Sequence, residues 1–413
     1  MPYLHPINLW TQNISRQESI LRIPGYMKNA YKFRLYPTKQ QIAKLDLTVE
    51  VCRLVYNMAL EDRKVAYGTE GISRSYEDQA AMLTAEKKAN PNLKAVFSQV
   101  LQDVLRRLDK AYKAFYRRVK AGENPGYPRF KGKGRYRSFT YPQVGFKLEG
   151  SKLSLSKIGS IRIFKHREIE GTIKTCTIKK ESSDRWYAIL VTELEDIPKR
   201  DPKTAIGVDV GLKNEVVTSD GESFQYPKYY HQYEEKLTIA QRELSRKKKG
   251  SNNRDKARIK VARIHQKITN LRKDFLHKLS RELVGKADLI VFENLNIKGM
   301  VQNHHLAKAI ADSAWSKLIQ MTVSKAEKAG KTVEMVDAKY TSQRCSSCGT
   351  IVPKDLSERV HDCPVCGLKL DRDHNAALNI LTLGLRGRAC GDPTPTLKGS
   401  KQAGSMKQEA LSL

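Results

Sequence analysis

The chain has 413 residues, and its 75 lysines and arginines outnumber its 44 aspartates and glutamates, so its formal net charge is +31 at pH 7. Hydrophobic residues make up 40% of the sequence, which suffices for buried cores and argues against an intrinsically disordered chain. No uncharged apolar run approaches the roughly 18 to 20 residues that cross a bilayer, and we find no secretory signal. We therefore expect a soluble cytoplasmic protein of two or three domains.

The excess of positive charge predicts polyanionic partners, because contacts of Lys and Arg to phosphate release counterions. Nucleic acid is the first candidate. A basic protein without such a partner is disfavoured, because uncompensated charge of this size destabilises the compact state by self-repulsion. No helix-turn-helix or finger array that could read a long DNA site is recognisable in the sequence.

The N-terminal half changes its pattern several times. Residues 1–26 form a leader without clear patterning, to which we assign no role. Alternating residues predict a strand at Ala30–Leu35, and Thr38 is a typical N-cap for a helical region that extends to about Lys120. Between residues 122 and 197, short alternating segments separated by turns predict a small antiparallel sheet or barrel.

The first part of this predicted barrel, from Pro125 to Phe139, interleaves basic side chains with aromatic rings. Aromatic faces stack on unpaired bases while cations hold phosphates, so the segment is a candidate platform for single-stranded nucleic acid or RNA. A loop whose rings pack into the barrel would look the same, and the sequence does not separate the two interpretations. The candidate contacts are Arg129, Lys131, Arg135, Tyr136 and Arg137.

After a linker at residues 198–202, two carboxylates occur in strands of the buried type. Asp209 interrupts the apolar strand Ala205–Val210, and Glu293 ends the apolar run Leu289–Phe292. A buried carboxylate is costly unless it binds a metal or has a partner, and the carboxyl ends of strands in open α/β sheets are where sites form. The alternative for Asp209 is an edge-strand residue that faces water.

A third acidic position lies at the start of a predicted helix. Asp371 and Asp373 are two residues apart, so at 100° per residue their side chains project about 200° apart, and only one can face a shared site. The residues alone leave open which one does. Three separated carboxylates brought together by a mixed sheet can hold two Mg²⁺ ions about 3.5 to 4 Å apart, as two-metal phosphodiester hydrolysis requires.

Four of the seven cysteines form two CxxC pairs, Cys345 with Cys348 and Cys363 with Cys366, each followed by a glycine. Such pairs place four thiolates around one tetrahedral Zn²⁺, and because no position is left open for water, we expect the zinc to be structural. His361 is an alternative ligand that the site does not need. Since these cysteines lie between Glu293 and Asp373, we expect zinc to help place the third acid.

A strongly basic segment separates the first acid from the second. From Arg242 to Arg281 there are 15 Lys and Arg and 3 Asp and Glu, and an apolar stripe predicts a helix that buries one face. A turn is predicted at Lys247–Ser251. The cations are suited to hold phosphate without reading bases, although a solvated surface is the alternative. The candidate contacts are Lys247, Lys248, Lys249, Arg254 and Arg258.

The ordered set of motifs is similar to that of the TnpB family of transposon-encoded, RNA-guided DNA nucleases, which are related to type V CRISPR effectors. GVDVGLKN at 207–214, VFENLNIKGM at 291–300 and DRDHNAALNI at 371–380 resemble the three RuvC nuclease motifs, and TSQRCSSCG with CPVCG resembles the inserted zinc ribbon. YKFRLYPTKQQ, CRLVYNMAL and PGYPRFKGK resemble the N-terminal region of the family. The resemblance covers about Met27 to Leu383, and family members usually begin near Met27.

The resemblance implies a multidomain α+β fold in the prokaryotic cytosol or nucleoid. Its parts are a β-barrel at 27–37 and 122–197, an inserted helical recognition domain at 38–121, an RNase H-like (RuvC) nuclease domain at 203–340 and 368–385 and a zinc ribbon at 341–367. Asp209, Glu293 and Asp373 would be the catalytic acids, which favours Asp373 over Asp371. Beyond the resemblance, the composition of residues 386–413, with Pro, Gly and scattered Ser and Lys, predicts a disordered tail.

The resemblance also implies the partners. A guide RNA derived from the transposon end would pair with double-stranded target DNA next to a short adjacent motif, and the single site would cut both strands with two Mg²⁺. One alternative is a DNA strand-transfer transposase, which also uses three acids on this fold. Another is an RNA-guided DNA-binding regulator without cleavage, which the intact acids disfavour.

Overall fold

The computed structural model describes residues 26–211, 215–295, 314–337, 339–355 and 358–389. The predicted leader, except for Tyr26, and most of the predicted tail lie outside the described residues. Within the described part, no helix is both long and apolar enough to cross a membrane. The chain divides into two compact units, the first mainly Thr38–Ile178 with Ala188–Asp196 and the second mainly the residues from Ile197 onward.

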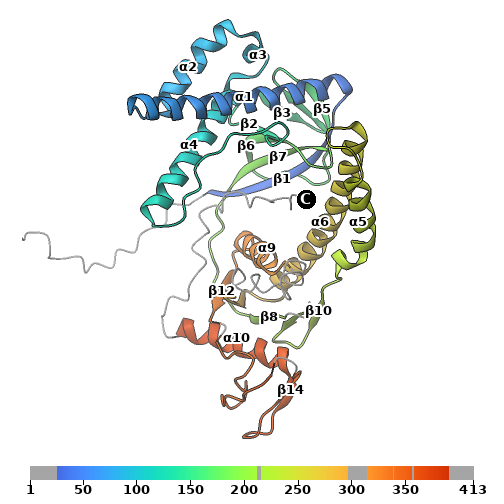
Figure 1. Ribbon diagram of the computed structural model, residues 1–413. Helices are drawn as coiled ribbons and strands as arrows, with labels where there is room; N and C mark the ends of the chain where they lie inside the picture. The colour runs from blue at the N-terminus through green and yellow to red at the C-terminus, as the bar shows by residue number, and fades with distance from the viewer. Residues whose placement is uncertain (1–25, 212–214, 296–313, 338, 356–357, 390–413) are drawn as a thin grey trace, which may run out of the picture. The chain divides into compact units, whose positions relative to one another are not determined.

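An antiparallel sheet of seven strands, in the order β2-β6-β7-β1-β5-β4-β3, nearly closes into a barrel (Figure 1). Its burial alternates along each strand, as in β7 where Trp186, Ala188 and Leu190 point inward, and this confirms the predicted small barrel. The strands are β1 (Tyr26–Tyr36), β2 (Ser138–Tyr141), β3 (Phe146–Glu149), β4 (Lys152–Leu155), β5 (Gly159–Phe164), β6 (Thr172–Lys180) and β7 (Trp186–Glu195).

The helical region lies between β1 and β2 in the sequence. It contains α1 (Lys39–Glu70), α2 (Tyr76–Ala89), α3 (Pro91–Lys94) and α4 (Ser98–Lys120). Thr38 caps α1 as predicted: its hydroxyl accepts a hydrogen bond from the Gln41 backbone, and the Gln41 side chain accepts one from the Thr38 backbone at 2.9 Å. This reciprocal capping box satisfies backbone donors that the first turn leaves unpaired.

The second unit is built on a mixed sheet of five strands in the order β10-β9-β8-β11-β12. The central strands β8, β11 and β12 are parallel, whereas β9 and β10 are added antiparallel at one edge. The strands are β8 (Ala205–Val210), β9 (Glu215–Thr218), β10 (Ser223–Gln225), β11 (Leu289–Glu293) and β12 (Thr332–Val336).

Helices cover both faces of this sheet. On one face, α6 (Asn252–Lys286) and α9 (Trp315–Lys328) share a buried apolar cluster with Ile206, Val208 and Val210 of β8. On the other face, α10 (Arg372–Ala389) packs Ile380 against a second cluster that includes Leu289, Val291 and Val336. The helix α10 extends into the segment predicted as a disordered tail.

The close approach of α10 to the sheet depends on Gly207. A Cβ atom at this position would lie 2.1 Å from the carbonyl oxygen of Ala377, which is far inside a normal contact. Ala376 and Ala377 are themselves buried, so small residues on both partners let the helix backbone lie against β8. The consequence is that the first turn of α10 lies beside the carboxyl end of this strand.

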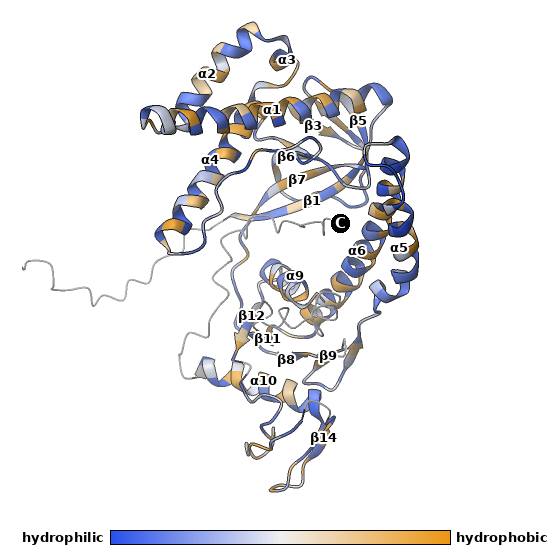
Figure 2. Ribbon diagram, viewed as in Figure 1, coloured by the Kyte–Doolittle hydropathy of each residue, from blue (hydrophilic) through white to orange (hydrophobic). Residues whose placement is uncertain are grey.

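The basic segment forms two helices, α5 (Tyr229–Ser245) and α6, with the predicted turn between them. Gly250 in this turn has φ +83°, a conformation that glycine adopts without strain, and the hydroxyl of Ser251 caps α6 by accepting from the Arg254 backbone. Figure 2 shows both helices mostly in hydrophilic colours, with isolated hydrophobic positions along α6.

Candidate functional site

The register of β8 and β11 places Asp209 and Glu293 on neighbouring strands. Phe292 lies opposite Val208 in this parallel pair, so the next residues, Glu293 and Asp209, are also neighbours. Side chains at matching positions of adjacent strands point to the same face and lie about 5 Å apart. Both acids are buried, with 9% and 7% of their surfaces exposed, so the edge-strand alternative for Asp209 does not hold.

The helix α10 brings Asp373 to the same place. Gly207 and Asp209 are two residues apart on β8, which is about 6.6 Å, and both face α10. Asp373 precedes Ala377, the residue that contacts Gly207, by four positions, which is about 6 Å along the helix. The distance from Gly207 to Asp209 along the strand nearly equals the distance from Ala377 to Asp373 along the helix. Asp373 therefore lies near Asp209 at the carboxyl end of the strand.

The charges of the three carboxylates interact. Burial, together with the like charges of Glu293 and Asp373, raises the pKa of Asp209 well above its usual range. Burial also raises the pKa of Glu293, against a hydrogen bond donated by the Thr341 hydroxyl, and the charge of Asp337 adds to the rise. Carboxylates that repel one another in a buried site are the donor set that a divalent cation neutralises, so these residues fit Mg²⁺.

Asp371 has a different role from Asp373. Its Oδ1 accepts hydrogen bonds from the backbone N–H groups of Asp373 at 2.9 Å and His374 at 3.1 Å, which makes Asp371 the N-cap of α10. The charge of Asp373 instead acts on Asp209, and its carboxylate lies 3.5 Å from the guanidinium of Arg359. The cap therefore provides a structural role for Asp371 and leaves Asp373 to face the site.

The four predicted zinc ligands come together. Among the described residues, these cysteines form the one group of three or more His, Cys, Asp or Glu side chains whose ligand atoms all lie within 4.8 Å of one another. The Sγ atoms of Cys345 and Cys366 are 3.6 Å apart, as are those of Cys348 and Cys363. A tetrahedron with Zn–S bonds of about 2.3 Å has edges of about 3.8 Å, so the thiol cluster fits one zinc ion.

Each CxxC pair lies in a tight turn closed by its glycine. The N–H groups of Gly349 and Gly367 donate to the carbonyls of Cys345 and Cys363, and both glycines have positive φ angles, +80° and +73°. The hydroxyl and backbone of Thr350 lower the pKa of the Cys348 thiol to about 6. Against a hydrogen bond from the Leu368 backbone, burial and the other three thiols raise the pKa of Cys366 to about 11. His361 is not a member of the cysteine cluster, in line with the expectation that it is not needed.

Two residues near the acids were not singled out in the sequence. Asp337 directly follows β12, and its charge acts on Glu293. Its position after a mostly buried strand resembles that of Glu293, but the strand itself contains Thr332 and Glu334, which weakens the signal in the sequence. Thr341, the first residue of the TSQRCSSCG motif, donates a hydrogen bond to Glu293 Oε1. No local pattern marks such a contact, because it joins segments far apart in the chain.

The aromatic and basic platform divides into two parts in the structure. Tyr136 is 7% exposed and Phe139 is fully buried, so these rings pack inside the first unit, and Tyr136 offers no open face to a base. The phenol of Tyr136 lies 3.4 Å from the Arg107 guanidinium. Burial disfavours Tyr136 as a nucleic-acid contact, because its ring lies against Tyr56 of α1 and Arg107 of α4.

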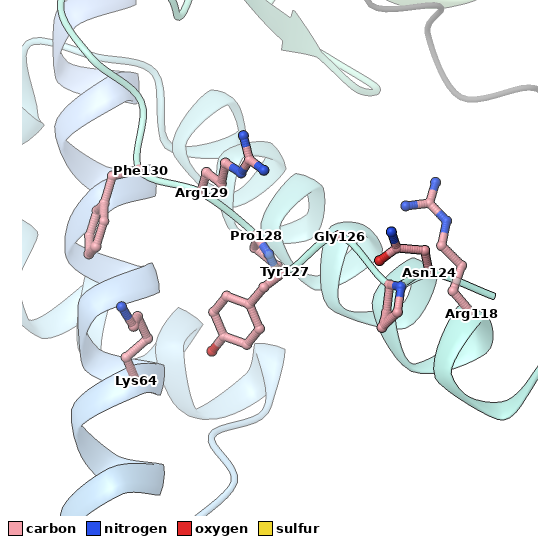
Figure 3. A pocket seen from close by; sticks show the side chains of 9 residues that line it. Lys64, Arg118, Asn124, Gly126, Tyr127, Pro128, Arg129 and Phe130 are labelled. Atoms are coloured by element: carbon pink, nitrogen blue, oxygen red, sulfur yellow. The ribbon is translucent and has the colours of Figure 1, made fainter. Parts of the chain in front are cut away.

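The preceding loop remains open to solvent. Tyr127 and Phe130 are exposed and, with Arg129, line a pocket of about 620 Å³ between α1, α4 and the loop, in which no carboxylate takes part. Figure 3 shows Lys64 of α1 pointing toward Phe130, and its Nζ lies 5.3 Å from the ring centre. Arg118 of α4 lines the other side of the pocket.

The remaining predicted nucleic-acid contacts differ in what they already bind. Arg135 and Lys247–Lys249 are exposed. Arg137 is exposed as well, but its Nε donates to the Gly134 carbonyl at 2.7 Å, and the backbone of Lys131 is paired with Asn57. The guanidinium of Arg254 donates to the carbonyls of Leu244 and Lys247 and so closes the turn between α5 and α6. The Arg258 guanidinium lies 3.3 Å from Asp255, so these last two arginines also have structural partners.

Models of three protein families match the chain. A model described as a probable transposase (OrfB_IS605) matches residues 188–304, and the Cas12f1-like TNB domain matches 315–380, which includes the four cysteines. A helix-turn-helix domain model matches residues 27–71, where the sequence showed no such motif. In the structure this segment is β1 followed by the single continuous helix α1.

Several relatives match nearly the whole chain. A protein of Streptomyces pristinaespiralis named "Putative RNA-guided DNA endonuclease" is 38% identical over 93% of this chain and 96% of its own length. InsQ of Escherichia coli K12, which has the same descriptive name, is 33% identical over 90% of this chain and 96% of its own. The solved structure of Cas12f1 with single-guide RNA and target DNA has a TM-score of 0.53 at 13% identity, over 86% of this chain and 98% of that one.

The fold, the cysteine cluster and these matches define the class, a transposase-type protein with a Cas12f1-like zinc-binding domain. Within this class, the chain belongs to the TnpB family.

Proposed function

We propose that the chain is an RNA-guided endonuclease that cuts double-stranded DNA matched by a guide RNA derived from the transposon end, next to a short adjacent motif. The observation that carries the proposal is the convergence of Asp209, Glu293 and Asp373 at one end of the mixed sheet. The relatives named as RNA-guided DNA endonucleases support the guide and the target.

The three carboxylates would hold two Mg²⁺ ions, which when bound activate a water and stabilise the leaving oxygen of a phosphodiester. Asp209 and Glu293 supply donors from neighbouring strands, and Asp373 supplies its donor from the first turn of α10. In this proposal the second unit is the RNase H-like nuclease domain of RuvC type, and α10 covers the face of the sheet on which Asp209 lies. The single site cuts the two DNA strands in turn.

The remaining parts of the chain hold nucleic acid in this proposal. The pocket of Lys64, Arg118, Tyr127, Arg129 and Phe130 combines cations for phosphate with exposed rings for bases. The exposed lysines of the turn between α5 and α6 contact phosphate without reading sequence, so binding should weaken steeply as salt rises. The RNA reads the target by base pairing, as in other RNA-guided effectors.

Purifying the full chain from cells that also carry its transposon end tests the proposal. We expect a discrete RNA to copurify, and the complex to cut, with Mg²⁺, a plasmid that matches this RNA but not a plasmid with a scrambled target. Sequencing the RNA and mapping the DNA ends give the measurement. Absence of a discrete RNA, or equal cutting of both plasmids, would contradict the proposal.

The same assay separates cleavage from strand transfer. The family model described as a probable transposase favours an alternative function, DNA strand transfer. In that function the same acids would join a DNA end to a target strand. Joined products would support strand transfer, whereas free ends on a matched plasmid support an endonuclease.

A pair of substitutions at Asp371 tests its assignment as a helix cap. Asp371→Ala should lower the free energy of unfolding by about 1 kcal/mol, because the N–H groups of Asp373 and His374 lose their acceptor. Asp371→Asn should retain both the cap and cleavage, since asparagine caps helices as well as aspartate. Denaturant unfolding and plasmid cleavage measure the two effects. Loss of cleavage in Asp371→Asn, with unchanged stability, would show that Asp371 is a metal ligand.

A further inference from the structure

Hydrogen bonds between buried groups connect the zinc-binding segment to Glu293. The Thr341 hydroxyl donates to Glu293 Oε1. The backbone carbonyl of Thr341 accepts from Nδ2 of Asn379 at 2.9 Å, and the same amide donates to the carbonyl of Arg344 at 2.7 Å. Arg344 directly precedes Cys345, so Asn379 connects the segment that supports Glu293 with the first zinc ligand.

Asn375, one turn earlier on α10, extends the connection. Its Nδ2 donates to the Arg344 carbonyl at 2.8 Å, and its Oδ1 accepts from the Ser346 backbone at 2.9 Å. The side chain therefore binds the backbone on both sides of Cys345. Asn375 lies two residues after Asp373 in the same helix, so α10 carries an acid of the site and the two amides that hold the zinc-binding turn.

The three polar side chains are buried, with exposed fractions of 4% for Thr341, 0% for Asn375 and 5% for Asn379. A buried polar group that is left unpaired is costly, so these hydrogen bonds favour one arrangement of the segment over others. We call Thr341, Asn375 and Asn379 together the Thr341 latch.

We propose that the Thr341 latch positions Glu293 for metal binding and transmits the shape of the zinc-binding turn to the active site. This inference rests on the proposed function. None of the three side chains is proposed to touch metal or substrate, so they are positioning residues. The zinc ion then acts on the site through a defined set of contacts as well as through the general fold of its domain.

The Thr341 latch counteracts charge repulsion at Glu293. Glu293 lies near Asp209 and Asp337, and each of these carboxylates repels it. Without a donor, a glutamate in this environment lowers its energy by rotating away from the other acids, which would remove a metal ligand from the site. The Thr341 hydroxyl opposes this rotation because it stabilises the carboxylate where it is. Hydrogen bonds to metal-binding carboxylates commonly have this role, and losing one costs about 10- to 100-fold in metal affinity or activity.

The decisive comparison is Thr341→Val against Thr341→Ser. Valine keeps the shape of threonine and removes the hydroxyl, whereas serine keeps the hydroxyl and removes a methyl group. The test has two measurements. Electron paramagnetic resonance would measure Mn²⁺ binding to the zinc-loaded full chain without nucleic acid, and a cleavage assay would measure plasmid cutting as a function of Mg²⁺ concentration. Thr341→Val should weaken Mn²⁺ binding by about 10- to 100-fold and raise the Mg²⁺ requirement accordingly, with one zinc per chain retained. Thr341→Ser should stay within about threefold of the parent chain.

Asn379→Leu provides an independent arm that leaves the hydroxyl in place. It removes both donors of Asn379 at similar volume, so it should also weaken Mn²⁺ binding, although the hydrogen bonds of Asn379 go to the backbone carbonyls of Thr341 and Arg344. Parent-like Mn²⁺ binding in both Thr341→Val and Asn379→Leu overturns the inference, and so does equal loss in the serine and valine variants. If the parent chain does not cut DNA but the variants differ in Mn²⁺ binding as expected, the proposed function fails and the latch stands.

Discussion

Asp209→Asn should abolish DNA cleavage and at the same time stabilise the Mg²⁺-free protein. In the proposed site, removing one of the three carboxylates that would hold the metal costs several kcal/mol of transition-state stabilisation, so we expect cleavage to fall by about 10³-fold or more. Binding of guide RNA and target DNA should be unchanged, because Asp209 is buried and the proposed phosphate contacts lie elsewhere. Single-turnover cleavage and equilibrium DNA binding measure the two effects separately.

The stability effect has a defined dependence on pH. Because the folded protein raises the pKa of Asp209, it retains this proton at pH values where the unfolded chain has lost it. The contribution of Asp209 to stability is therefore fully present below about pH 3.9, the usual value for aspartate, and is lost as pH rises through the folded value. Asparagine does not ionise, so the variant should melt at a higher temperature than the parent near pH 7.5, and the difference should shrink toward pH 4.

Added Mg²⁺ and a second aspartate provide the controls. Mg²⁺ should raise the melting temperature of the parent and have little effect on Asp209→Asn, because the ion binds the folded carboxylates. Asp274→Asn makes the same substitution at an exposed position of α6, where the carboxylate lies 2.9 Å from Nζ of Lys278, and should leave cleavage and the pH dependence unchanged. Full cleavage by Asp209→Asn would refute the proposed active site.

Patterns within short segments predicted much of the site. The CxxC spacings predict the thiol cluster because each pair needs only one tight turn, and the structure places all four sulfurs together. Asp209 was equally informative, because it is a charged residue inside an apolar strand. A buried carboxylate is costly unless it binds a metal or has a partner, so its position predicted a site. The register that places Glu293 beside Asp209 could not be derived from the sequence. The sequence indicated only that functional residues tend to gather at the carboxyl ends of parallel strands.

Features that depend on contacts between distant segments could not be predicted in this way. The sequence alone did not show whether Asp371 or Asp373 faces the site. In the structure, Asp371 accepts a hydrogen bond from the backbone of α10, which identifies it as the helix cap. Tyr136 and Tyr127 both lie in the same aromatic and basic stretch, yet one is buried and the other exposed, because only the packing of α4 and the barrel decides which ring is covered. The Thr341 contact to Glu293 spans 48 residues and has no signature in either segment.

Removing the zinc should be nearly as damaging to cleavage as removing an acid. In Cys345→Ser the site loses one of four thiolates, so we expect zinc content to fall from one per chain toward zero. The zinc-binding turn would then lose the geometry that Asn375 and Asn379 recognise at Arg344 and Ser346. A displacement of about 1 Å at a reacting centre can cost about 10²-fold in rate, so we expect at least this loss of cleavage.

Cys176→Ser is the matched control for this substitution. Cys176 is a free thiol buried in β6 of the barrel, so serine there also replaces sulfur by a hydroxyl in a buried position and should destabilise the fold without removing zinc. Metal analysis, thermal unfolding and plasmid cleavage are measured on both variants. If Cys345→Ser loses its zinc but cuts at the parent rate, the ribbon does not place the acids. If Cys176→Ser loses cleavage to the same extent with zinc retained, general destabilisation explains both. If Cys345→Ser loses both zinc and cleavage while Cys176→Ser keeps both, the result supports a connection from the cysteines through α10 to the three carboxylates.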